Sequence, residues 1–117
     1  MERVLEPRKG AAPDSRPVAV LQGPYCVSSC EGFLLMMRAL PRVATVGLPS
    51  RGASGNPGPM DLLPGWQVHA SRWQALTPEG KCFEGTGLEP HARVEAPAGS
   101  HERGDPTLDR AILLLKK

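Results

Sequence analysis

Three cysteines and three histidines are the side chains of this 117-residue sequence with the most distinctive chemistry. They are Cys26, Cys30, Cys82, His69, His91 and His101. Thiolates and imidazoles are the usual ligands of structural zinc, and Cys26 and Cys30 could form a first ligand pair. A zinc finger also needs a close second pair, whereas His91 lies nine residues after Cys82 and ten before His101. The sequence therefore predicts no metal site.

Nucleophilic and acid–base catalysis also lack clear candidates. A Cys/His pair must be held at hydrogen-bond distance by a rigid scaffold, and the sequence gives no sign of one. The carboxylate pair Asp105 and Asp109 is explained by helix capping and the helix dipole, and the pair Glu84 and Glu89 has no further support. The glycines of 85–87 form only a fragment of a dinucleotide-binding fingerprint. We expect no catalytic residue, no cofactor-binding residue and no cofactor, and we predict that the chain is not an enzyme.

The charge pattern argues against several classes of partner. The net charge is +2, and the longest basic clusters are the pairs at 8–9 and 116–117, so we expect no nucleic-acid binding. The longest apolar run, 33–37, is far shorter than the roughly 20 residues of a membrane span. The apolar stretch 18–21 is too short and too late for a signal peptide. The default expectation is a cytoplasmic or nuclear protein, and an odd number of cysteines fits a reducing compartment.

Thirteen prolines divide the chain and leave three windows for helices. These windows are residues 29–40, 65–77 and 106–117. Before the first, Ser28 and Glu31 have the S-x-x-E spacing of a capping box. Before the third, Asp105 is placed as an N-cap and Pro106 as the first helical residue. Both patterns predict where a helix begins.

Two of these windows carry apolar residues that could contact a partner. Residues 106–117 place Leu108, Ala111, Ile112 and Leu115 on one stripe. A helix of about twelve residues is marginal alone, so this stripe needs a partner surface such as a protein groove, a membrane interface, or the helix of residues 28–40 in the same chain. Attachment to a membrane surface is a weaker alternative, because the polar face carries little charge.

The window 65–77 would place Trp66 and Trp73 on one helical face. Two aromatic anchors on a helix could dock into a partner. The other interpretation is that the two rings form a weak core of the chain itself or remain exposed.

Composition favours a loosely collapsed chain over a globular domain. Leu, Ile, Val and Phe contribute 25 residues, close to the rough 20% of a chain below which disorder is expected. The stretches 18–21 and 42–48 could support strands, but they are too short to predict a sheet. Residues 49–64 and 78–105 are linker-like. The predicted fold of 1–117 is therefore largely disordered or loosely collapsed, mostly coil with up to three short α-helices, no sheet and no globular domain.

Gly, Ala, Arg and Pro, whose codons are GC-rich, make up 48 of the 117 residues. This bias resembles the translation of a short GC-rich transcript rather than any functional family. We interpret the chain as a proline-rich, glycine-rich, low-complexity product of a short GC-rich open reading frame without identifiable biochemical activity. The alternative is a small protein-interaction module that docks through the C-terminal amphipathic helix or the helix carrying Trp66 and Trp73.

Overall fold

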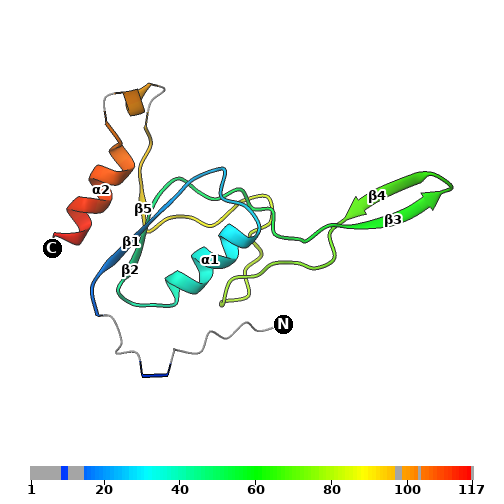
Figure 1. Cartoon of the computed structure of the whole chain (residues 1–117), viewed down its shortest axis with the longest axis horizontal. Helices are drawn as coiled ribbons and strands as arrows, with labels where there is room; N and C mark the ends of the chain where they lie inside the picture. Colours follow the sequence, from blue (N-terminus) through cyan, green and yellow to red (C-terminus); the bar gives the residue numbers. More distant parts are fainter. Residues whose placement is uncertain (1–8, 11–14, 97–98, 103, 117) are drawn as a thin grey trace.

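The computed structural model describes residues 9–10, 15–96, 99–102 and 104–116 (Figure 1). These residues form a three-stranded sheet flanked by two helices, and a separate two-stranded hairpin. In chain order the elements are β1 Val18–Gln22, α1 Ser29–Arg38, β2 Val43–Gly47, β3 Gly58–Leu63, β4 Trp66–Ala70, β5 Ala92–Arg93, the 3₁₀ turn η1 Ser100–Glu102 and α2 Pro106–Leu115.

The three-stranded sheet is parallel, with strand order β1-β2-β5. Val18 lies opposite Val43 at the start of the β1–β2 ladder, and Val46 lies opposite Ala92 on β5. Parallel neighbours need a crossover connection, which α1 supplies between β1 and β2. Strand β2 is central, and Thr45 and Val46 are fully buried. Burial on both faces explains why β2 is a short, nearly continuous run of small and apolar residues.

The two helices pack against opposite sides of the sheet (Figure 1). Helix α1 packs against β2 and buries Leu34, whereas α2 packs against β1 and β2 and buries Ala111. The start of α2 is fixed by the Asp105 carboxylate, which accepts the backbone N–H groups of Thr107 and Leu108 at 2.9 and 3.1 Å. Local capping and burial of one helix face therefore act together.

A small apolar core lies beside α1 and draws on distant parts of the chain. Its buried members are Cys26, Leu34, Phe83 and Leu88, and Val20, Leu35 and Ala75 pack against them. Phe83 and Leu88 belong to the segment 78–105 that the sequence suggests is linker-like. They tie that segment to the turn between β1 and α1.

The hairpin of β3 and β4 projects away from the sheet (Figure 1). Its turn is Pro64-Gly65, where Gly65 has φ 81, and Leu63 pairs with Trp66 across it. Proline followed by a glycine of positive φ is the signature of a type II turn. All of its residues except Gly58 are exposed, including Trp66 at 70%.

The expectation of a largely disordered, mostly coil and sheet-free chain was wrong, because the described residues contain five strands in two sheets and two helices. The windows 29–40 and 106–117 do contain α1 and α2, although residue 117 lies outside the described residues. The helix expected over 65–77 is absent, since the turn at Gly65 pairs Trp66–Ala70 with β3 instead. Residues 49–64 include β3, and residues 78–105 include β5.

Candidate functional site

The turn between β1 and α1 holds Ser28 at the surface in an uncommon backbone conformation. Ser28 has φ 57 and ψ −116, and the other described non-glycine residue of positive φ is Asn56. These angles match the first central position of a type II′ turn, where glycine is favoured. Holding a residue other than glycine in this backbone conformation costs about 1–3 kcal/mol of folding free energy, and such strain concentrates at functional sites. Ser28 is therefore the first candidate for a functional side chain.

A disulfide between Cys26 and Cys30 spans this turn, with the two Cα atoms 5.4 Å apart. Cys26 is buried in the core, so the bridge ties the first turn of α1 to it. An odd number of cysteines fits a reducing compartment, but the turn formed by the three intervening residues brings the Cα atoms of Cys26 and Cys30 within bridging range. Cys82 is a free thiol.

The Glu31 side chain accepts the hydrogen bonds that connect the Ser28 turn to the neighbouring loop. It is fully buried, and its carboxylate accepts five donors. At Oε1 these are Ser50 Oγ and Gly52 N–H, both at 2.6 Å, and at Oε2 they are Ser28 N–H at 3.2 Å, Ala53 N–H at 3.0 Å and Ser54 Oγ at 2.6 Å. A carboxylate so saturated fixes the Ser28 turn to the loop that follows β2.

The ionisation of Glu31 follows from these contacts. Burial opposes the charged form, but the hydrogen bonds from Ser50, Ser54, Gly52 and Ala53 outweigh it and lower the pKa of Glu31 below the ordinary carboxyl value of 4.5. The carboxylate is therefore charged at neutral pH and acts as an acceptor for all five donors.

The loop after β2 is held in turn by residues 83–88. Ser50 Oγ accepts the Leu88 N–H at 2.8 Å, and Glu84 Oε1 accepts the Ser54 N–H at 2.9 Å. Gly52 has φ 73, and a Cβ added there would overlap backbone atoms of residues 83, 85 and 87. Glycine at 52 thus permits the close approach of the two backbones.

The surroundings of Ser28 suit the development of negative charge. Ser29 is the first residue of α1, and the first N–H groups of a helix have no acceptor within the helix. The positive end of the helix dipole also favours an anion at this point. Among the residues that the structure describes, no histidine or lysine is hydrogen-bonded to Ser28. This arrangement resembles the strand-to-helix turn that presents a nucleophilic serine, with the next N–H as an oxyanion donor.

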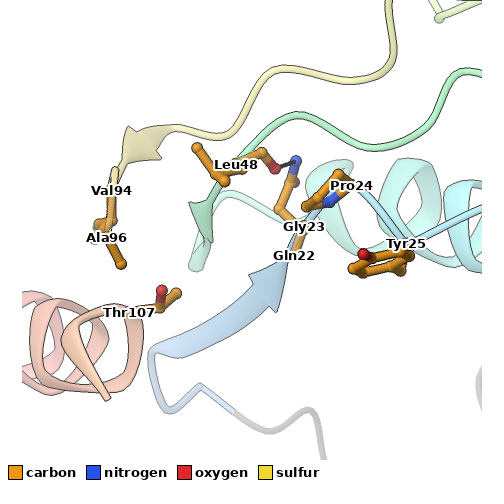
Figure 2. Close-up of a pocket in the computed structure, with 8 residues that line it drawn as sticks. All are labelled: Gln22, Gly23, Pro24, Tyr25, Leu48, Val94, Ala96 and Thr107. Atoms are coloured by element: carbon orange, nitrogen blue, oxygen red, sulfur yellow. Dashed lines mark hydrogen bonds between the residues drawn. The ribbon is translucent and has the colours of Figure 1, made fainter. Parts of the chain in front are cut away.

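A hollow of about 320 Å³ lies on the β1 side of this turn (Figure 2). Its lining residues are Gln22, Gly23, Pro24, Tyr25, Leu48, Val94, Ala96 and Thr107. Gln22 is buried and donates from Nε2 to the carbonyl oxygens of Leu48 and Leu88 at 3.0 and 2.7 Å. The hollow lies where β1, β2 and β5 end, which is where parallel sheets usually bind ligands.

The histidines and cysteines singled out in the sequence do not gather at one place. His69 lies on β4, and the side chain of His101 is outside the described part of the structure. His91 Nδ1 accepts the Thr45 N–H at 2.9 Å, and burial together with the Arg38 charge lowers the pKa of His91. In the described ranges no group of three His, Cys, Asp or Glu side chains could hold a metal ion. The same ranges contain no helix able to span a bilayer.

The residues predicted to contact a partner are also separated. Leu108, Ile112 and Leu115 are partly exposed on α2, but Ala111 is buried. Trp66 lies on the hairpin, and Figure 1 places the hairpin and α2 at opposite ends of the molecule. Trp73 follows β4 and donates from Nε1 to the Ser54 carbonyl oxygen at 2.7 Å. Contact of any of them with a partner stays a prediction.

Comparison with known proteins identifies the fold. A family model described as peptidase family S41 matches residues 3–94. The chain belongs to peptidase family S41. No curated protein matches the sequence.

Three solved structures share the fold of this chain. A candidate peptidase from Parabacteroides merdae is 29% identical with a TM-score of 0.81, over 93% of this chain and 35% of that protein. The tricorn protease is 21% identical with a TM-score of 0.69, over 86% of this chain and 10% of its own. Mature CPAF complexed with lactacystin is 22% identical with a TM-score of 0.63, over 87% of this chain and 19% of that protein. This S41 chain thus spans about a third or less of each of these structures.

The family match overturns two expectations. The prediction that the chain is not an enzyme was wrong, and so was its interpretation as a low-complexity reading-frame product without identifiable activity. In the sequence, the S-x-x-E spacing of Ser28 and Glu31 predicts only a helix cap. The available signal was the position of Ser28, which lies between the apolar stretch 18–21 and the helix window that begins at residue 29, as the serine of a nucleophile turn does.

Proposed function

We propose that this chain carries the nucleophilic serine of a serine peptidase, and that Ser28 is that residue. The observation behind the proposal is the conformation of Ser28, with φ 57 and ψ −116 at the start of α1. It is supported by the buried Glu31 carboxylate, which accepts the Ser28 N–H, and by membership of the S41 family. Peptide hydrolysis as the activity of the whole protein is part of the proposal.

In the proposed reaction Ser28 Oγ forms a bond to the carbonyl carbon of the substrate, and its proton passes to a general base. The carbonyl oxygen becomes an oxyanion, which the Ser29 N–H and the N-terminus of α1 stabilise. The C–N bond then breaks, and the amine leaves with the proton. Water hydrolyses the resulting ester of Ser28 and restores the hydroxyl. Among the described residues no histidine or lysine side chain is hydrogen-bonded to Ser28, and the proposal assigns the role of base to no residue.

Labelling with a fluorophosphonate tests this proposal, because the reagent forms a stable adduct with activated serines. Peptide mass spectrometry then locates the adduct among the seven serines of the chain. We expect the adduct on Ser28, loss of labelling in Ser28→Ala and retention in the matched variant Ser29→Ala. An adduct that persists in Ser28→Ala, or that is spread evenly over the serines, would rule out Ser28 as the nucleophile.

A further inference from the structure

Trp73 is anchored to the loop that carries the candidate site. Its indole Nε1 donates to the Ser54 carbonyl oxygen at 2.7 Å, and the neighbouring Arg72 N–H donates to the Gly55 carbonyl oxygen at 2.9 Å. A Cβ added at Gly55 would overlap the Ser71 side chain, so glycine at 55 lets the segment before Trp73 pass closely. The hydrogen bond fixes the nitrogen edge of the indole and restricts the orientation of the ring.

The same residue, Ser54, also contacts the Ser28 turn. Ser54 Oγ donates to Glu31 Oε2 at 2.6 Å and lies 3.5 Å from the Ser28 carbonyl oxygen. Ser54 is therefore hydrogen-bonded through its carbonyl to Trp73 and through its hydroxyl to the centre of the candidate site. Trp73 and Ser28 thus both contact Ser54.

Trp73 keeps much of its surface open despite this anchor, since 51% of it is exposed. Tyr25 and Val27, which precede Ser28 in the same turn, are exposed as well. An extended polypeptide that presents a carbonyl to Ser28 would thus meet apolar and aromatic surface. A fixed aromatic ring offers a large contact area at little cost in side-chain entropy.

We infer that Trp73 forms one wall of a substrate subsite beside Ser28, and that this subsite selects a large apolar or aromatic side chain next to the scissile bond. The inference rests on the proposed role of Ser28 and adds the substrate class. A hydrophobic subsite discriminates by roughly 10- to 200-fold between side chains that fill it and smaller ones. Substrates with phenylalanine at this position should therefore be preferred over substrates with alanine by at least about 10-fold.

Two peptidyl phosphonates that differ only in phenylalanine or alanine at the reacting position test the inference. The measured quantity is the ratio of their rates of adduct formation at Ser28. We expect the ratio to fall towards one in Trp73→Ala and to keep its wild-type value in the matched variant Trp66→Ala, whose indole lies on the hairpin. An equal loss of both rates in Trp73→Ala, with the ratio preserved, would mean that Trp73 only supports the fold and would overturn the inference.

A binding measurement separates this inference from the proposed function. In Trp66→Phe, Trp73 is the sole tryptophan, and its indole N–H gives a single NMR signal. A phenylalanine-containing peptide amide should shift that signal more than its alanine counterpart, whether or not the fluorophosphonate labels Ser28. Failure of labelling alone contradicts the nucleophile, whereas an indole signal that responds to neither peptide, or equally to both, contradicts the subsite.

Discussion

Substitution of Glu31 by glutamine isolates the role of the buried carboxylate in holding the Ser28 turn. The side chain keeps its shape, but one oxygen becomes an amide nitrogen. In its more favourable orientation the glutamine side chain keeps its oxygen towards Ser28, Ala53 and Ser54. Its NH₂ group then faces Ser50 and Gly52. The Ser50 hydroxyl can rotate to accept, but the buried Gly52 N–H loses its acceptor, which costs about 1–3 kcal/mol. The remaining hydrogen bonds lose their charge assistance, so the total loss is about 3–5 kcal/mol.

Urea unfolding followed by circular dichroism and tryptophan fluorescence measures this loss. The matched control is Glu89→Gln, because Glu89 is 65% exposed in its side chain and its contact with Arg93 lies at the surface. The control should change the free energy of unfolding by no more than about 0.5 kcal/mol. If Glu31→Gln were as stable as Glu89→Gln, the carboxylate would not hold the turn.

Three further predictions follow from the same site. Although burial opposes ionisation of Glu31, its hydrogen bonds lower its pKa, so the stability it supplies should be complete above pH 4.5 and decline as the pH falls below that value; urea titrations should show a shallower decline for Glu31→Gln. Ser28→Gly should raise the free energy of unfolding by about 1 kcal/mol, because glycine accepts φ 57 without strain, and it should abolish fluorophosphonate labelling; a destabilised variant would mean that Ser28 is not strained. Alkylation of the unfolded chain should modify one thiol before reduction and three afterwards, and three before reduction would exclude the Cys26–Cys30 bridge.

Local sequence signals predicted the helices but not the sheet. The capping residues before α1 and α2 act within four residues of each helix start, so the sequence alone exposes them. Strand β1 becomes a strand only through pairing with β2, 25 residues later, and its five residues give no local evidence of that partner. Phe83 and Leu88 sit in proline- and glycine-rich sequence, and their burial depends on the distant turn after β1. Composition therefore understated how much of the chain is ordered.

A helix was predicted over residues 65–77 because their sequence pattern fits both a helix and a hairpin. Trp66 and Trp73 are seven residues apart, which suits one helical face, but Pro64-Gly65 is also a turn signal between two apolar segments. Pairing of β4 with β3 satisfies the backbone hydrogen bonds and decides between them.

Only part of the candidate site could be predicted from the sequence. The S-x-x-E spacing predicts that Glu31 accepts the Ser28 N–H, and the structure has that hydrogen bond at 3.2 Å. The other four donors to Glu31 lie 19–23 residues further along the chain and follow only from the β1-α1-β2 crossover. The positive φ of Ser28 likewise results from the fold around it, and no local sequence pattern predicts it.

The rate of fluorophosphonate labelling in the folded and the urea-unfolded chain tests whether the fold activates Ser28. All seven serines become equivalent hydroxyls when the chain unfolds. If the fold activates Ser28, this serine reacts faster than the other six in the folded chain, and the selectivity disappears in urea. Equal reactivity of Ser28 and the adjacent Ser29 in the folded chain would contradict it.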